Sequence, residues 1–258
     1  MPNIIVCYKW VLDESDIRIG GDLSLDVSRA KKRISEYDKN AIEIGTQLFE
    51  SAGGTYQALS YGAEDVAKSL QDALSRGPET ATWVNDSAAG DADAFVTANA
   101  LAGAVAKMGA YDLVICSESS SDASNQQVPA RLAKKLGIPV ITSVVKLECV
   151  AEGVKAVRRL EDVTETLLVT GPAVYAVLPE VAQPRFPSIK QLMGAKKKPK
   201  TELAVSDLGL SDAELAPKRK VLSVKGYVAT RKNIVLKDDS VEAMAKDVVA
   251  NLVRDGVL

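Results

Sequence analysis

Short apolar runs alternate with longer helix-period segments through the first two thirds of this 258-residue chain. The apolar runs lie at residues 3–8, 56–61, 81–84 and 112–116. Between them, apolar residues recur three and four positions apart: Ala41, Ile44 and Leu48; Val66, Leu70 and Leu74; Ala98, Leu101 and Val105. Continuous apolar strands separated by amphipathic helices indicate a mostly parallel sheet covered on both faces. We therefore predict an α/β fold class with an open, doubly wound sheet.

The pattern changes after Pro139. Strand-like runs at 140–150, 154–160, 165–171 and 173–178 are joined by short turns that leave no room for crossover helices. They predict a β-rich extension of the same sheet or a small antiparallel layer.

Residues 182–199 carry three of the ten prolines and a lysine cluster, which predicts an extended arm. Helical periodicity returns near the C-terminus at Val241, Met244, Val248 and Leu252, with Asp239 or Ser240 as the N-cap. We expect a core over residues 1–183, and an extended C-terminal arm plus terminal helix over residues 184–258.

The charge balance argues against a nucleic-acid partner. The chain has 32 Lys and Arg against 34 Asp and Glu, a formal charge of -2, so it has no overall positive field. The lysine run at 196–200 is either a local nucleic-acid patch or a solvated linker, and the mild acidity favours the linker. No apolar run reaches the ~18 residues of a membrane span, and no basic leader precedes an apolar segment. We expect a cytoplasmic protein without membrane insertion.

The absence of histidine removes the commonest general base and the imidazole metal ligands. The cysteines, Cys7, Cys116 and Cys149, are far apart and form no CxxC pair, so neither a disulfide framework nor a zinc site is indicated. Cys7 and Cys116 lie in apolar runs and fit core thiols better than nucleophiles. We expect no catalytic residue and no metal site.

A polar loop at residues 117–127 separates the fourth apolar run from a helical segment with Val128, Leu132 and Leu136 on one face. Ligands of open parallel sheets bind outside the carboxyl ends of strands. Hydroxyl and amide donors, followed by a helix N-terminus, suit a phosphate or pyrophosphate. Asp122 has the wrong sign for phosphate, so we expect it to cap backbone or to accept from a ribose or adenine group. The alternative is that the loop only caps a helix over 124–136.

Two further strand ends favour a ligand. The first apolar run ends in Cys7, Tyr8 and Lys9, which places a cation at this edge, and another ends in Tyr61 and Gly62, where glycine allows close approach to the backbone. Neither G-x-G-x-x-G nor G-x-x-x-x-G-K-[ST] is present, so any nucleotide is held in a less stereotyped way.

Residues 156–176 resemble the signature region of the β subunit of electron-transferring flavoproteins. The matching positions are Arg158, Glu161, Asp162, Glu165, Pro172 and Val174. The resemblance extends through VCYKWVLDE, ISEYDKNAIE, SSDASNQQV and PRFPSIKQLMGAKKKP. Within the family, the segments ISEYDKNAIE and SSDASNQQV most resemble the branch associated with nitrogen fixation and carnitine or acyl-CoA reduction.

The resemblance implies a heterodimer. A larger α subunit makes most of the contacts to a redox-active FAD, and this subunit holds its own nucleotide, either AMP or a second FAD. By position, the nucleotide contacts implied are Cys7, Ser35, Tyr61, Ala123, Gln126, Gln127 and Val128, with Asp122 and Asn125 close enough to include.

The resemblance also implies partner contacts. The segment at 184–197 would recognise an acyl-CoA dehydrogenase through Ile189, supported by Met193; alternatively, both side chains pack back on the core. Glu165 would pair with an arginine of the α subunit.

Three functions follow as hypotheses. The first is an electron carrier without substrate chemistry of its own, in which the protein positions and tunes a flavin. The second is a subunit of an electron-bifurcating, NADH-oxidising flavoprotein with a second FAD bound here. The third is an adenine-nucleotide-binding regulatory protein without redox function.

Overall fold

The computed structural model describes residues 1–229, 231–237 and 240–258. It divides into two compact units, one of residues 1–18 with 26–224 and the other of residues 19–25 with 225–258. Residues 184–224 fall in the first of these units.

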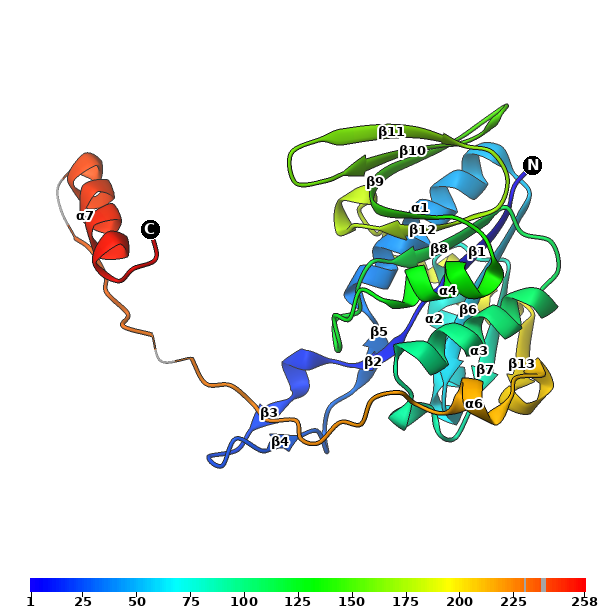
Figure 1. Ribbon diagram of the computed structural model, residues 1–258, viewed down its shortest axis with the longest axis horizontal. Helices are drawn as coiled ribbons and strands as arrows, with labels where there is room; N and C mark the ends of the chain where they lie inside the picture. Colours follow the sequence, from blue (N-terminus) through cyan, green and yellow to red (C-terminus); the bar gives the residue numbers. More distant parts are fainter. Residues whose placement is uncertain (230, 238–239) are drawn as a thin grey trace. The chain divides into compact units, whose positions relative to one another are not determined.

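The first unit is built on a sheet that has nine strands in the described residues, in the order β11-β10-β9-β12-β8-β1-β6-β7-β13 (Figure 1). The strands are β1 (Asn3–Cys7), β6 (Thr55–Gly62), β7 (Thr80–Asn85), β8 (Leu113–Ser117), β9 (Val140–Val150), β10 (Gly153–Arg159), β11 (Thr164–Val169), β12 (Ala173–Val177) and β13 (Lys200–Ala204). The pairings of β10 with β9 and with β11 are antiparallel, and the others are parallel. The predicted α/β class with a mostly parallel sheet is confirmed.

Helices cover both faces of this sheet. They are α1 (Glu36–Ala52), α2 (Leu70–Ser75), α3 (Ala94–Lys107) and α4 (Val128–Leu136). Residues along β1 alternate between two buried clusters, because successive strand side chains point to opposite faces. Ile4 and Val6 pack with α1 and α2 residues, whereas Ile5 and Cys7 pack with α3 and α4 residues. This division makes the sheet doubly wound.

The chain reverses its winding direction at β1. From β1 it passes through α1 to β6 on one side of β1, and later it passes from β7 through α3 to β8 on the other side. The crevice between the carboxyl ends of β1 and β8 is therefore the topological switch point, where open α/β sheets bind ligands.

The strands after Pro139 extend this same sheet. β9 pairs in parallel with β12, and β10 and β11 add an antiparallel edge, so the first of the two predicted arrangements is confirmed.

Residues 182–199 are not extended throughout. Ser188 starts helix α5 (Ile189–Ala195) with a capping box, and β13 then joins the sheet edge beside β7. Lys198 donates to the carbonyl oxygens of Leu74, Gly77 and Pro78 at 2.9, 3.3 and 2.6 Å, where α2 ends. At least this lysine of the basic run therefore has a structural role.

Shorter elements complete the described chain. They are β2 (Trp10–Leu12) paired with β5 (Lys32–Ile34), β3 (Arg18–Ile19) paired with β4 (Leu25–Asp26), α6 (Asp212–Leu215), and the 3-10 helices η1 (Glu14–Asp16), η2 (Glu64–Ser69), η3 (Ala89–Asp91), η4 (Pro179–Val181) and η5 (Val205–Leu208).

The second unit contains helix α7 (Val241–Arg254), which has no buried residue. Its N-cap is Ser240, whose side chain accepts from the Ala243 N–H at 3.3 Å, while the other predicted cap, Asp239, lies outside the described residues. In the part of the chain that the structure describes, no helix has the length and apolarity to cross a membrane.

Candidate functional site

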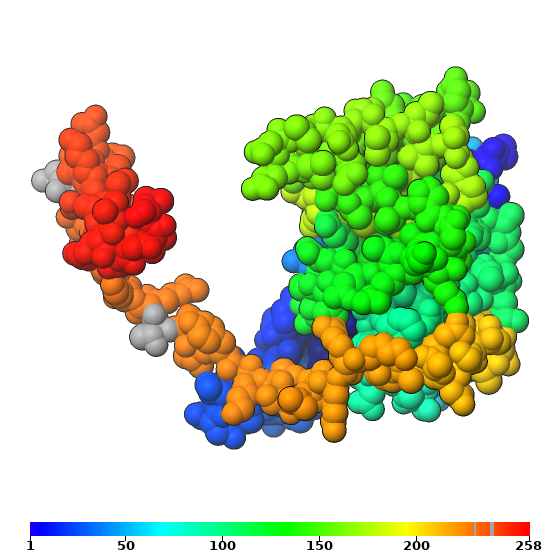
Figure 2. Space-filling view, viewed as in Figure 1, coloured from blue at the N-terminus to red at the C-terminus, as the bar shows by residue number. Residues whose placement is uncertain are grey.

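The loop between β8 and α4 lies at the switch point and at the surface of the first unit (Figure 2, green). The Lys9 Nζ, just beyond β1, lies 2.6 Å from the Asp122 Oδ2 in this loop. The side chains of Lys9 and Asp122 are 46% and 37% exposed. Lys9, the predicted cation, therefore contacts the polar loop. This is expected because the carboxyl ends of parallel strands lie at the same edge of a sheet.

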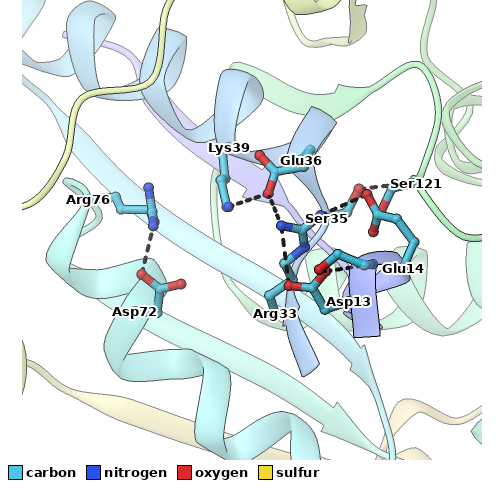
Figure 3. Close-up of polar contacts among 10 residues, drawn as sticks. Asp13, Glu14, Arg33, Ser35, Glu36, Lys39, Asp72, Arg76 and Ser121 are labelled. Atoms are coloured by element: carbon cyan, nitrogen blue, oxygen red, sulfur yellow. Dashed lines mark hydrogen bonds and ion pairs between the residues drawn. The ribbon is translucent and has the colours of Figure 1, made fainter. Parts of the chain in front are cut away.

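Ser35 ties the start of α1 to the same loop. It is the N-cap of α1, yet its side chain does not cap that helix. Instead its buried Oγ accepts from the Ser121 N–H at 3.2 Å (Figure 3). The Ser35 N–H donates to the Lys9 carbonyl at 3.0 Å. Three chain segments therefore converge at one point.

Arg33 supports this arrangement from β5. Its guanidinium lies 3.4 Å from Asp13, 2.7 Å from Glu14 and 2.9 Å from Glu36 (Figure 3). These contacts connect the segment after β2, strand β5 and the first turn of α1, so they hold the approach to Ser35 in place.

The start of α4 is open. Its N-cap, Gln127, makes no side-chain capping bond, and Pro129 has no N–H. In the described residues, the N–H groups of Val128 and Ala130 have no acceptor. The loop side chains therefore do not cap α4, contrary to the alternative considered from the sequence. A helix start with free N–H groups and partial positive charge suits an anion.

The loop backbone is strained just before this helix. Ser124 and Gln126 have φ values of 45° and 55°, in the left-handed region that side chains other than glycine rarely adopt. Such conformations cost about 1–3 kcal/mol each and cluster at ligand sites. They also explain why α4 begins at Val128 and not at the predicted residue 124.

Asp38 is a residue of this site that the sequence did not reveal. Its carboxyl group is buried below the loop and contacts both the Lys9 N–H and the Ser117 hydroxyl. Burial raises the pKa of Asp38 to about 7, and the contacts of Asp38 with Ser117 and Lys9 act in the opposite direction without outweighing burial. Its position between Ile34 and Ala41, on the apolar side of α1, was the available signal.

Asp122 behaves differently. Partial burial raises its pKa, but hydrogen bonding and charge from Lys9, with the Ser120 hydroxyl, outweigh burial and hold the pKa below its ordinary value. Asp122 is therefore ionised near neutral pH.

Three predicted side chains point away from the loop. The buried Cys7 thiol lies beside Cys116, and the Tyr8 hydroxyl is 2.7 Å from the Ser69 Oγ in the core. The Tyr61 hydroxyl donates to Asp86 at 2.7 Å, beyond β7.

The remaining predicted positions lie close by. Gly62 ends β6, and a Cβ there would come within 2.4 Å of the Val66 side chain, so the turn requires glycine. The Gln127 Oε1 accepts from the Arg131 Nε at 3.0 Å. The other loop positions are Ala123 and Gln126, which are exposed, and Asn125 and Val128, which are half-buried.

The predicted partner residues lie elsewhere on the first unit. Ile189 and Met193 of α5 are 81% and 57% exposed. Glu165 lies opposite Arg158 in the β10–β11 register, with 3.7 Å between the Glu165 Oε2 and the Arg158 Nη1.

This geometry defines a doubly wound α/β protein with an anion-suited helix start at its switch point. Comparison with known families identifies it more closely: the chain belongs to the family of the electron transfer flavoprotein domain, whose model matches residues 22–208. The match includes the loop, Asp38 and the segment at 156–176. Membership of this family supports a role in electron transport as a flavoprotein.

Proposed function

We propose that this chain is the β subunit of a heterodimeric electron-transferring flavoprotein. It shuttles electrons between a donor and an acyl-CoA dehydrogenase or related acceptor, through an FAD at the interface with the α subunit. It also holds its own adenine nucleotide at the switch point. The observation that carries this proposal is the uncapped start of α4, which follows the loop whose Asp122 pairs with Lys9.

The residues at the switch point fit the adenylate half that AMP and FAD share. The free N–H groups of Val128 and Ala130, with the Lys9 ammonium, would hold phosphate. The Ser121 Oγ is buried without a partner in the described structure, so it has a hydrogen bond to give. The Asp122 carboxylate would accept from the ribose or adenine, and the Asn125 amide would accept from or donate to them.

The flavin shared with the α subunit supplies the electron transfer when bound. This chain then acts as a cytoplasmic carrier without substrate chemistry of its own, and Glu165 pairs with an arginine of the α subunit. Its half-exposed side chain on β11 leaves it accessible to a partner.

The redox partner would dock on α5. Ile189, Met193 and the adjacent Phe186 are all exposed, and Phe186 is 96% exposed. Exposed large apolar side chains that cluster on one segment typically mark a protein interface.

Ligand analysis of the intact complex tests this function. The chain is expressed with its α subunit, purified without added nucleotide, and its non-covalent ligands are released and weighed. One FAD with one AMP per heterodimer is the expected result. Two FAD would favour the electron-bifurcating complex, an adenine nucleotide without any partner would favour the non-redox regulator, and no adenine compound would overturn the site.

A further inference from the structure

The Asp38 carboxyl group lies between two strand ends. Its side chain is 4% exposed in the first turn of α1. The Oδ2 accepts from the Lys9 N–H at 2.7 Å, just beyond β1. The Oδ1 contacts the Ser117 Oγ at the end of β8.

The Ser117 hydroxyl has a second neighbour that constrains its proton. Its Oγ lies 2.7 Å from the Ser119 carbonyl oxygen. A carbonyl and an ionised carboxylate both only accept, and a serine hydroxyl has one proton to donate. Both contacts are therefore hydrogen bonds together only when Asp38 is protonated, donating to the Ser117 Oγ while Ser117 donates to Ser119.

We propose that Asp38 is a positioning residue that carries a proton, and that its neutral form holds the turn at residues 117–119 in the shape that accepts the nucleotide. The proposal rests on the proposed nucleotide site and goes beyond it, because it assigns the protonation state that this site requires.

The charged and titratable groups around Asp38 are Lys9, Asp122, Tyr8 and Cys116. The Lys9 ammonium is paired with Asp122, which is ionised. Burial raises the pKa of Tyr8, and contact with Cys7 together with burial raises that of Cys116, so both stay neutral at pH 7. Burial raises the pKa of Asp38 to about 7, so of these groups it is Asp38 that titrates near neutrality.

Ionisation of Asp38 would affect an anionic ligand in two ways. It would add a second negative charge close to Asp122, and it would draw the single Ser117 proton away from the Ser119 carbonyl. Since the protonated form binds better, nucleotide affinity should fall as pH rises through the pKa of Asp38. Well above that pKa, the affinity should fall about tenfold per pH unit until binding to the ionised form takes over.

The test is titration of the nucleotide-stripped heterodimer with AMP between about pH 5.5 and 8.5, a span that brackets that pKa. Asp38→Asn is the central variant, because its amide donates to Ser117 and its carbonyl accepts from Lys9, as the neutral acid does. We expect D38N to keep the low-pH affinity of the wild type and to lose the fall in affinity that the wild type shows above about pH 7. The titration of the AMP phosphate itself, whose second pKa is about 6, remains in both proteins. D38A should bind weakly at every pH.

Asp122→Asn is the matched control. Asp122 carries the same charge nearby but is already ionised at these pH values, so D122N should change the affinity and still bind AMP more weakly as pH rises. The midpoint of that fall should move to lower pH, because the Asp122 charge helps to raise the pKa of Asp38. A pH profile of D38N that matches the wild type, or an affinity of D38N as low as that of D38A, would overturn the proposal.

A ligand-free measurement separates this inference from the proposed function. In the wild type, the NMR chemical shift of the Asp38 carboxyl carbon should change with a midpoint near neutral pH. Titration at the usual acidic pKa would overturn the role of Asp38 even if AMP binds. Failure of the wild type to bind AMP at any pH would instead overturn the nucleotide site.

Discussion

At the residue scale, two buried tyrosines show how hydrogen-bond partners set the value of a polar group. The Tyr56 hydroxyl donates to the Ile42 carbonyl at 2.7 Å, whereas the Tyr175 hydroxyl is buried without a partner in the described structure. A satisfied buried hydroxyl stabilises modestly, and an unsatisfied one carries its full desolvation cost.

We therefore expect Tyr175→Phe to leave the free energy of unfolding unchanged or to raise it by about 1 kcal/mol. Tyr56→Phe, the matched control, should lose about 1 kcal/mol because it breaks a made bond. Urea unfolding of both variants measures the difference. Equal losses in the two variants would show that the Tyr175 hydroxyl has a partner after all.

Lys9 provides a second prediction at this scale. Lys9→Met keeps most of the side-chain length but removes the charge, so AMP affinity should fall about 10- to 100-fold, the value of a charge-assisted hydrogen bond. Stability should change by less than about 1 kcal/mol, because the pair with Asp122 is half exposed.

The control is Lys32→Met. Lys32 lies 2.6 Å from Asp65 and is similarly exposed, but it is outside the loop. Its loss should not change AMP affinity, as measured by calorimetry. The same affinity in K9M and the wild type would remove Lys9 from the site.

At the element scale, helices α3 and α4 begin in contrasting ways. Asp93 caps α3 by accepting from the Phe95 and Val96 N–H groups at 2.9 and 3.1 Å, while no loop side chain caps α4. Capping side chains stabilise a helix, whereas an uncapped start within a polar loop remains free to hold a ligand.

This contrast predicts opposite outcomes for two variants. Asn125→Ala should leave the free energy of unfolding within about 0.5 kcal/mol of the wild type and lower AMP affinity about tenfold. Asp93→Ala should cost about 1–2 kcal/mol and leave AMP affinity unchanged. Thermal unfolding and AMP titration measure both quantities. A loss of stability in N125A would restore the interpretation that the loop is only a cap.

The elements that the sequence predicted are those with strong hydrophobic patterns. The run at 140–150 coincides with β9, because its apolar side chains build the sheet. Strand β13 was not predicted, because it is an edge strand whose residues are mostly exposed. Its sequence therefore shows no alternation of apolar and polar residues.

The sequence predicted that Lys9 and the loop of Asp122 lie at the same edge, because both come after apolar strands and parallel topology brings such strand ends together. The two side chains do meet there. Asp38 was not found, because an acidic residue in the first turn of a helix is ordinary for its interaction with the helix dipole. Its place on the apolar side of α1 indicated burial, but the contacts with the ends of β1 and β8 are visible only in the tertiary structure.

At the scale of the whole molecule, apolar surface remains exposed on both units. In the first unit it lies on α5 and the preceding residues, and in the second it includes Val241, Val249 and Val253 of α7. A chain with this much exposed apolar surface is consistent with a subunit of a larger assembly.

The last prediction concerns Ile189 as the proposed anchor for the proposed redox partner, an acyl-CoA dehydrogenase. Because its side chain is 81% exposed, Ile189→Ala should change the free energy of unfolding by less than about 0.5 kcal/mol. Truncation of a central anchor typically costs 2 kcal/mol or more of binding, so affinity for the acyl-CoA dehydrogenase should fall at least about tenfold. Electron transfer at low partner concentration should slow accordingly, with cofactor content unchanged.

Leu168→Ala is the control for Ile189→Ala, since Leu168 is a 55% exposed aliphatic residue on β11, away from α5. Stopped-flow reduction against partner concentration compares both variants with the wild type. A slowed reaction in I189A alone supports docking at α5, because only the anchor has been lost. Equal rates in I189A and the wild type, or an equal loss in L168A, would place the docking surface elsewhere.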